Sequence, residues 1–139
     1  MVVAIIAIAS TGVMFAIPDA STTALERDAQ RLAALLDSAR AQSRASGVSV
    51  TWQPTDEGFV FEGIAKIKNA KTGEMEDLVK FPTHWLSRET HVELASRLVL
   101  GPEPIIAQQE VVLRHEARSL TLATDGIRPF GIKSSDQVQ

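Results

Sequence analysis

The chain has 139 residues, a net charge of −3 and a pI near 5.6. This length suits one domain of ordinary size, and the mild acidity provides no overall basic field that would recruit nucleic acid. Because the chain contains no cysteine, disulfides and thiolate zinc sites are excluded.

The first predicted element is an uncharged apolar run from Val2 to Ile17, which Pro18 ends. As a helix its roughly 16 residues would reach about 24 Å, which is short of a ~30 Å hydrocarbon core. It lacks the basic start and the cleavage site of a signal peptide. We therefore expect residues 1–20 to be a truncated transmembrane or fibre-core helix, in which Gly12 allows close packing or bending. The other residues expected on this helix are Val2, Val3, Ile5, Ile6, Ile8, Val13, Phe15 and Ile17.

An amphipathic helix is predicted next, over residues 21–46. Ser21, Thr22 or Thr23 could cap it, and Glu26 is three residues after Thr23, the spacing of a capping box. Gly47 follows the last periodic residue as a helix stop. One apolar stripe recurs at three- and four-residue steps and predicts packing against a sheet. Its members are Leu25, Ala29, Leu32, Leu36 and Ala39.

The hydrophobic period changes to two after Gly47, which predicts a β domain over residues 47–139. Strands are expected around residues 48–52, 59–67 with a kink near Gly63, 78–81, 91–94, 111–113, 120–122 and 127–132. Turns are expected at 54–58 and at the pair Asp125-Gly126. The predicted fold is α+β: a long N-terminal helix, made of the apolar stub and the amphipathic half, packed on an antiparallel β-sandwich-like domain.

Residue sets that could support catalysis or metal binding are sparse. The three histidines, His84, His91 and His115, are not at a metal-ligand spacing, and His115 is expected in a solvated strand or loop. No serine lies in a nucleophile elbow, and Asp125-Gly126 offers too few carboxylates for calcium. We therefore expect no enzyme activity, no catalytic residue, no metal, no cofactor and no small-molecule substrate.

Two segments together carry a resemblance to a known family. The apolar stub leads into the stripe from Leu25 to Ala39-Arg40, then Gly47-x-x-Val50-x-Trp52, and the chain closes on Leu120 to Phe130. This order resembles the GspH/FimT group of type IV pilin-like proteins, which comprises minor pseudopilins of type II secretion and a related minor pilin. The chain departs from the family motif Gly-Phe-Thr-Leu-Ile-Glu, whose processing glycine and glutamate are absent here.

The resemblance implies a structural minor pseudopilin that assists protein export, with a single-pass helix in the bacterial inner membrane and its globular domain in the periplasm. It also implies methylation at the processed N-terminus. The implied partners are the major pseudopilin and the minor pseudopilins of the tip.

Two other functions compete with the pseudopilin. One is a minor pilin that binds DNA for uptake, but Arg128 and Lys133 are flanked by Asp125 and Asp136, so few phosphate contacts are on offer. The other is an anchored envelope enzyme. Trp85 and Leu86, in the loop-rich region between residues 82 and 109, are candidate subunit contacts; the alternative is that Trp85 fills the core.

Overall fold

The computed structural model describes residues 20–94 and 97–133. The predicted apolar stub Val2–Ile17, with Gly12 and its apolar neighbours, lies outside the described residues. Among the helices of the described ranges, none combines the length and apolar character needed to cross a membrane.

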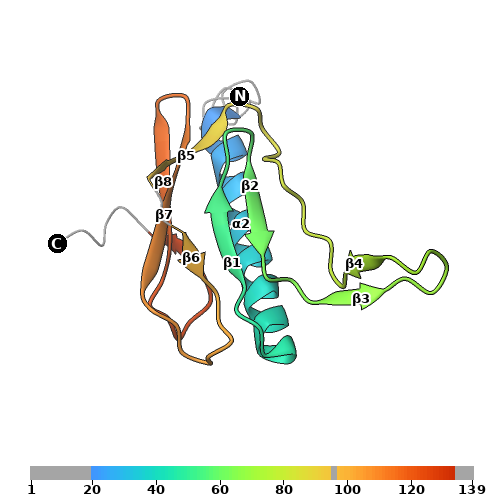
Figure 1. The fold of residues 1–139 in the computed structure, drawn as a ribbon. Helices are drawn as coiled ribbons and strands as arrows, with labels where there is room; N and C mark the ends of the chain where they lie inside the picture. The colour runs from blue at the N-terminus through green and yellow to red at the C-terminus, as the bar shows by residue number, and fades with distance from the viewer. Residues whose placement is uncertain (1–19, 95–96, 134–139) are drawn as a thin grey trace, which may run out of the picture.

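Helix α2, Ala20–Ser46, runs the length of the domain (Figure 1). The five residues expected to pack against the sheet, Leu25, Ala29, Leu32, Leu36 and Ala39, are between 0% and 2% exposed. The helix ends at Gly47, whose positive φ of 72° suits glycine and whose N–H donates to Ser43 O at 2.9 Å. The predicted cap at Ser21, Thr22 or Thr23 is wrong, because all three residues lie within α2, which already includes Ala20.

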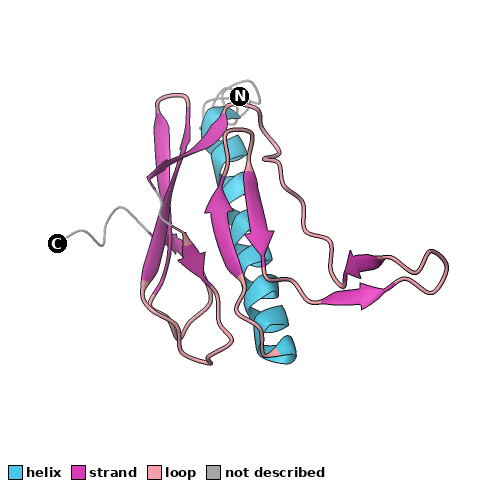
Figure 2. Ribbon diagram, viewed as in Figure 1, coloured by secondary structure: helices cyan, strands magenta, loops and turns pink. Residues whose placement is uncertain are grey.

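The strands form three antiparallel sheets (Figure 2). The first has the order β2-β1-β6, from β1 Thr51–Pro54, β2 Phe59–Glu62 and β6 Leu98–Val99. The second is a ribbon of β3 Lys66–Lys68 and β4 Met75–Asp77. The third has the order β5-β7-β8-β9, from β5 Thr90–Leu94, β7 Gln109–His115, β8 Arg118–Thr124 and β9 Gly131–Lys133.

The core lies between α2 and the two larger sheets. Trp52 and Phe59 fill it from the three-stranded sheet, and Val111, Leu113 and Leu122 fill it from the four-stranded sheet. All five are at most 1% exposed, and each lies on the side of its strand that faces the helix. The predicted α+β class, with one helix on antiparallel sheets, is confirmed.

The strand predicted over residues 78–81 is wrong. Residues 78–81 form no strand; Leu78 N–H instead closes the end of the β3–β4 ribbon on Ala65 O at 2.7 Å. Phe81 is half-buried against Phe61, with ring centroids 4.6 Å apart. The strand predicted over 59–67, with a kink near Gly63, is interrupted at that glycine: β2 ends at Glu62 and β3 begins at Lys66. At Gly63 φ is 90° and an added Cβ would collide with Ser49 O.

Candidate subunit-contact surface

Asp28 anchors the loop that carries both candidate contact residues. Its side chain is fully buried, and its carboxylate accepts the N–H of Leu86 at 2.8 Å, the N–H of Ser87 at 3.3 Å and the Thr90 hydroxyl at 2.7 Å. A buried carboxylate is tolerated when donors of this kind replace its water. Residues 84–90, hereafter the anchored loop, are therefore fixed to helix α2.

Within the anchored loop, Trp85 and Leu86 have different environments. Trp85 is half-buried and meets Phe59 edge-on, with ring centroids 4.8 Å apart. Leu86 is 63% exposed although its backbone N–H is tied to Asp28. The loop thus presents Leu86 to solvent and turns the Trp85 ring to the aromatic cluster of Trp52, Phe59 and Phe61.

His115 was expected in a solvated position, and that expectation is wrong. The alternation of β7 puts Val111, Leu113 and His115 on the core side, and the His115 side chain is 8% exposed. Its Nε2 lies 3.0 Å from Ser87 Oγ. His115 therefore gives the anchored loop a second tether, from the four-stranded sheet.

The contact of Ser87, Glu89 and His115 lacks the geometry of a catalytic triad. The Ser87 hydroxyl donates to Glu89 Oε2 at 2.8 Å, and this hydrogen bond is the main reason that the pKa of Glu89 lies below its usual value. His115 Nδ1, where a triad places its orienting acid, is buried without a partner among the described residues. The three side chains connect the loop to strand β7.

Arg40 fixes a second pair of loops against the other end of α2. Its guanidinium donates to Gly126 O at 2.7 Å, Pro104 O at 2.9 Å and Arg128 O at 3.2 Å. Asp37, one turn earlier, accepts the Phe130 N–H at 3.2 Å. The pKa of Asp37 is raised by burial, which outweighs the opposing effects of the Phe130 N–H and of Arg40. These loops present Ile105 and Ile127, which are 65% and 69% exposed.

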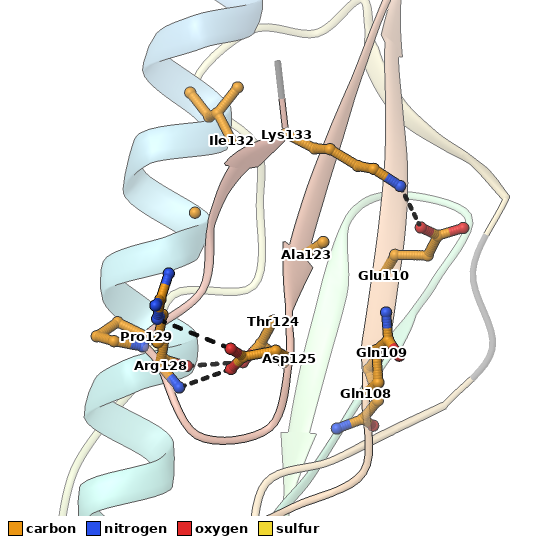
Figure 3. A pocket seen from close by; sticks show the side chains of 11 residues that line it. Gln108, Gln109, Glu110, Ala123, Thr124, Asp125, Arg128, Pro129, Ile132 and Lys133 are labelled. Carbon is orange, nitrogen blue, oxygen red and sulfur yellow. Dashed lines mark hydrogen bonds and ion pairs between the residues drawn. The ribbon is translucent and has the colours of Figure 1, made fainter. Parts of the chain in front are cut away.

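An open groove of about 580 Å³ crosses the face of the four-stranded sheet near β9 (Figure 3). Its charged walls are paired: Lys133 Nζ lies 3.8 Å from Glu110 Oε2, and Arg128 Nε lies 3.9 Å from Asp125 Oδ2. Backbone N–H groups of Arg128 and Ile127 lower the pKa of Asp125 and keep it anionic. The groove is therefore close to neutral.

Metal-ligating side chains do not cluster in the described parts of the chain: no group of three or more acids, histidines or cysteines is close enough to hold an ion. His84 and His91 are both exposed, and His91 Nδ1 lies 3.2 Å from Glu89 O.

Asp28 and Arg40 were not predicted as anchoring residues. The predicted stripe contains only small and apolar residues, yet Asp28 lies three residues after Leu25 and Arg40 lies four after Leu36. Those are the spacings of one helix face. A charge at a core-facing position signals a buried polar anchor, and that signal was present in the sequence.

The described residues form an α+β domain in which one long helix packs on antiparallel sheets, and polar side chains of that helix anchor the connecting loops. The fold is similar to that in the crystal structure of the type IV minor pilin FimU from Pseudomonas aeruginosa strain PAO1. The TM-score is 0.58 at 13% sequence identity, over 84% of this chain and 92% of that one. Comparison with protein-family models finds no match, and neither does comparison with curated protein sequences.

Proposed function

We propose that the chain is a structural subunit of a pilin-like assembly in the bacterial envelope. The observation that supports this proposal is the fold of the chain, one long helix packed on antiparallel sheets, which is similar to the fold of a type IV minor pilin. In this proposal the apolar stub Val2–Ile17 lies in the inner membrane and then in the core of a fibre, and it buries its side chains in both places. The globular domain lies in the periplasm and contacts other pilin-like subunits.

Within that class we propose a minor pseudopilin of type II secretion that contacts the major pseudopilin and the tip minor pseudopilins. The sequence pattern that resembles the GspH/FimT group supports this assignment. The alternative is a minor pilin that binds DNA for uptake. Contacts of Lys and Arg with phosphates dominate DNA affinity, and Arg128 and Lys133 each lie beside a carboxylate that reduces the local positive charge; this favours the secretion subunit.

Leu86 is the sharpest test of the contact surface. Because Leu86 is 63% exposed, Leu86→Ala is expected to leave the melting temperature within the small range of surface substitutions. It is expected to weaken co-purification of the full chain, in detergent, with the pilin-like subunits of its own organism, and to reduce secretion. Ile105→Ala is the matched control, because Ile105 is equally exposed but lies on another loop.

Trp85→Ala is expected to lower the melting temperature as well as binding, because the ring packs on Phe59. Unchanged co-purification of the Leu86 variant, with secretion intact, would contradict the proposed contact. Tight binding of duplex DNA at physiological salt, abolished by Arg128→Ala, would replace the secretion subunit with the DNA-uptake pilin.

A further inference from the structure

The backbone of the anchored loop is fixed to helix α2 by a single side chain, that of Asp28. The carboxylate accepts the N–H groups of Leu86 and Ser87, at 2.8 Å and 3.3 Å, and the Thr90 hydroxyl at 2.7 Å. Surface loops are ordinarily more mobile than the elements that they connect. This loop departs from that pattern, because the backbone of Leu86 itself is one of the groups that the helix holds.

The two larger sheets hold the same loop from other directions. The Trp85 ring meets the Phe59 ring of β2 edge-on, with centroids 4.8 Å apart. Ser87 Oγ lies 3.0 Å from His115 Nε2 at the end of β7. Leu86 lies between these two tethered neighbours, and its side chain is 63% exposed. The loop therefore presents one large apolar side chain to solvent on a backbone that is fixed on both sides of it.

The chemistry of Asp28 shows how much of this order depends on one residue. Its side chain is fully buried, and the donors that it binds, two N–H groups and a hydroxyl, are all uncharged. Burying a carboxylate costs free energy even when its hydrogen bonds are made. Its charge also makes those hydrogen bonds shorter and stronger than bonds to a neutral acceptor. The carboxylate is thus placed where strong bonds set the direction of an exposed leucine.

We propose that Asp28 is a positioning residue for the subunit contact: it holds Leu86 in the conformation that enters an apolar pocket of a partner subunit. The proposal rests on the proposed function, since the partner is another pilin-like subunit. Ordering a loop during association costs free energy, and a chain that is competent only part of the time binds in proportion to that fraction. Asp28 therefore sets the affinity of the contact without touching the partner.

Asp28→Asn tests this positioning in the full chain, in detergent, with the pilin-like subunit that co-purifies with the native chain. The amide keeps one acceptor oxygen, while its NH₂ group replaces the other oxygen and cannot accept a backbone N–H. We expect the association rate to fall about tenfold and the dissociation rate to change less than about twofold, because fewer molecules present the binding conformation. Leu86→Ala, which removes the contact itself, is expected to raise the dissociation rate instead.

The double variant Asp28→Asn/Leu86→Ala separates positioning from a general effect on the fold. If Asp28 acts through Leu86, adding Asp28→Asn to the Leu86→Ala chain is expected to change the affinity by less than about twofold, since coupled residues are not additive. Equal losses of affinity in the two backgrounds would overturn the proposal. An unchanged association rate of the Asp28→Asn chain would overturn it as well.

Asp37→Asn is the matched control for the same substitution on the same helix. Asp37 also accepts a backbone N–H, that of Phe130 at 3.2 Å, but this residue belongs to a different loop. The association rate of the Asp37→Asn chain is expected to equal that of the native chain. A loss as large as that of Asp28→Asn would contradict an effect specific to the anchored loop.

Ser87→Ala keeps the proposal testable if the Asp28→Asn chain does not fold. It removes the hydroxyl that joins the loop to His115 and leaves the Asp28 carboxylate in place. The association rate is expected to fall about threefold, because one of several tethers is lost, and this loss is expected to vanish in the Leu86→Ala background. No change in the association rate would overturn the proposal.

NMR order parameters of the Leu86 and Ser87 amides measure the loop without any partner. In the native chain they are expected to be near the value of about 0.85 typical of rigid backbone, and to fall in the Asp28→Asn chain. A mobile loop in a native chain that still co-purifies with pilin-like subunits would overturn the positioning alone. A rigid loop in a native chain that co-purifies with none of them would overturn the proposed function, and the subunit contact with it.

Discussion

Arg40 shows how one side chain can order two loops. It places a positive charge where three backbone carbonyls converge, those of Pro104, Gly126 and Arg128. Arg40→Met would leave Pro104 O without its donor, whereas Gly126 O keeps the Ile106 N–H and Arg128 O keeps the Thr124 hydroxyl. We expect the free energy of unfolding to fall by about 3 kcal/mol, because an orphaned buried polar group costs roughly 1–3 kcal/mol. Arg44→Met, at an exposed position one turn later, is expected to change it by less than about 0.5 kcal/mol. Urea unfolding of both variants measures the difference, and equal losses would contradict the anchoring role.

Asp37 makes a prediction about pH. Burial raises its pKa above the ordinary value of 3.8, so the folded state holds the proton more tightly than the unfolded state. The contribution of Asp37 to the free energy of unfolding is thus fully present below pH 3.8 and is lost as the pH rises through the raised pKa. The stability of the native chain minus that of Asp37→Asn is expected to fall over this window and then level off.

Asp125 provides the control of opposite sign. Its pKa is lowered by the N–H groups of Arg128 and Ile127, so its contribution is present above pH 3.8 and is lost as the pH falls through the lowered pKa. The difference between the native chain and Asp125→Asn is expected to rise with pH. Thermal unfolding across the acidic range measures both slopes, and slopes of the same sign would contradict the burial of Asp37.

At the scale of elements, the anchored loop depends on helix α2 through Asp28. Asp28→Ala removes the acceptor for two backbone N–H groups and the Thr90 hydroxyl. We expect the amide protons of Leu86 and Ser87 to exchange faster with solvent, because they lose their buried acceptor. Amides of β8, such as that of Leu122, are expected to change less. Asp28→Asn keeps one acceptor oxygen and is expected to give an intermediate effect. Hydrogen exchange followed by mass spectrometry or NMR distinguishes this outcome from a uniform acceleration over the whole domain.

Periodicity predicted the elements well where one face is buried along several residues. The stripe from Leu25 to Ala39 has that property, and so do the alternating residues of β7 and β8. It failed where the strand is short or exposed. The three residues of β3 are all exposed, so no buried face marks the strand, and the two-residue β6 is shorter than the window that periodicity needs.

For the candidate subunit-contact surface, the residues could be predicted from the sequence, but the directions of their side chains could not. Trp85 and Leu86 were selected by residue type, but residue type does not tell which of two neighbours turns inward. That choice is made by long-range contacts, with the Phe59 ring for Trp85 and with the Asp28 carboxylate, 58 residues away, for Leu86. The prediction for His115 was wrong because the charge pattern around it does not indicate which side of the strand is buried. In the structure, the alternation of buried and less buried residues along β7 places the His115 side chain on the core side.

At the scale of the whole molecule, the two larger sheets share a core and are also joined by one polar side chain. Gln109, the first residue of β7, takes the place of a neighbouring strand for β6: its Oε1 accepts the Val99 N–H at 2.7 Å and its Nε2 donates to Val99 O at 2.9 Å. The amide thereby satisfies both backbone groups at an edge that would otherwise be open to another chain. A carboxylate in the same place could accept but not donate.

Gln109→Glu is therefore expected to lower the free energy of unfolding by about 1–2 kcal/mol, through one lost hydrogen bond and the repulsion between the new charge and Val99 O. Gln108→Glu introduces the same charge one residue earlier at an exposed position and is expected to be close to neutral. Protonation of the new glutamate restores a donor, so the deficit of Gln109→Glu is expected to shrink as the pH falls toward its pKa, while Gln108→Glu shows no such recovery. Urea unfolding at neutral and acidic pH measures both variants, and a deficit that is equal in the two, or independent of pH, would mean that the Gln109 amide does not join the sheets.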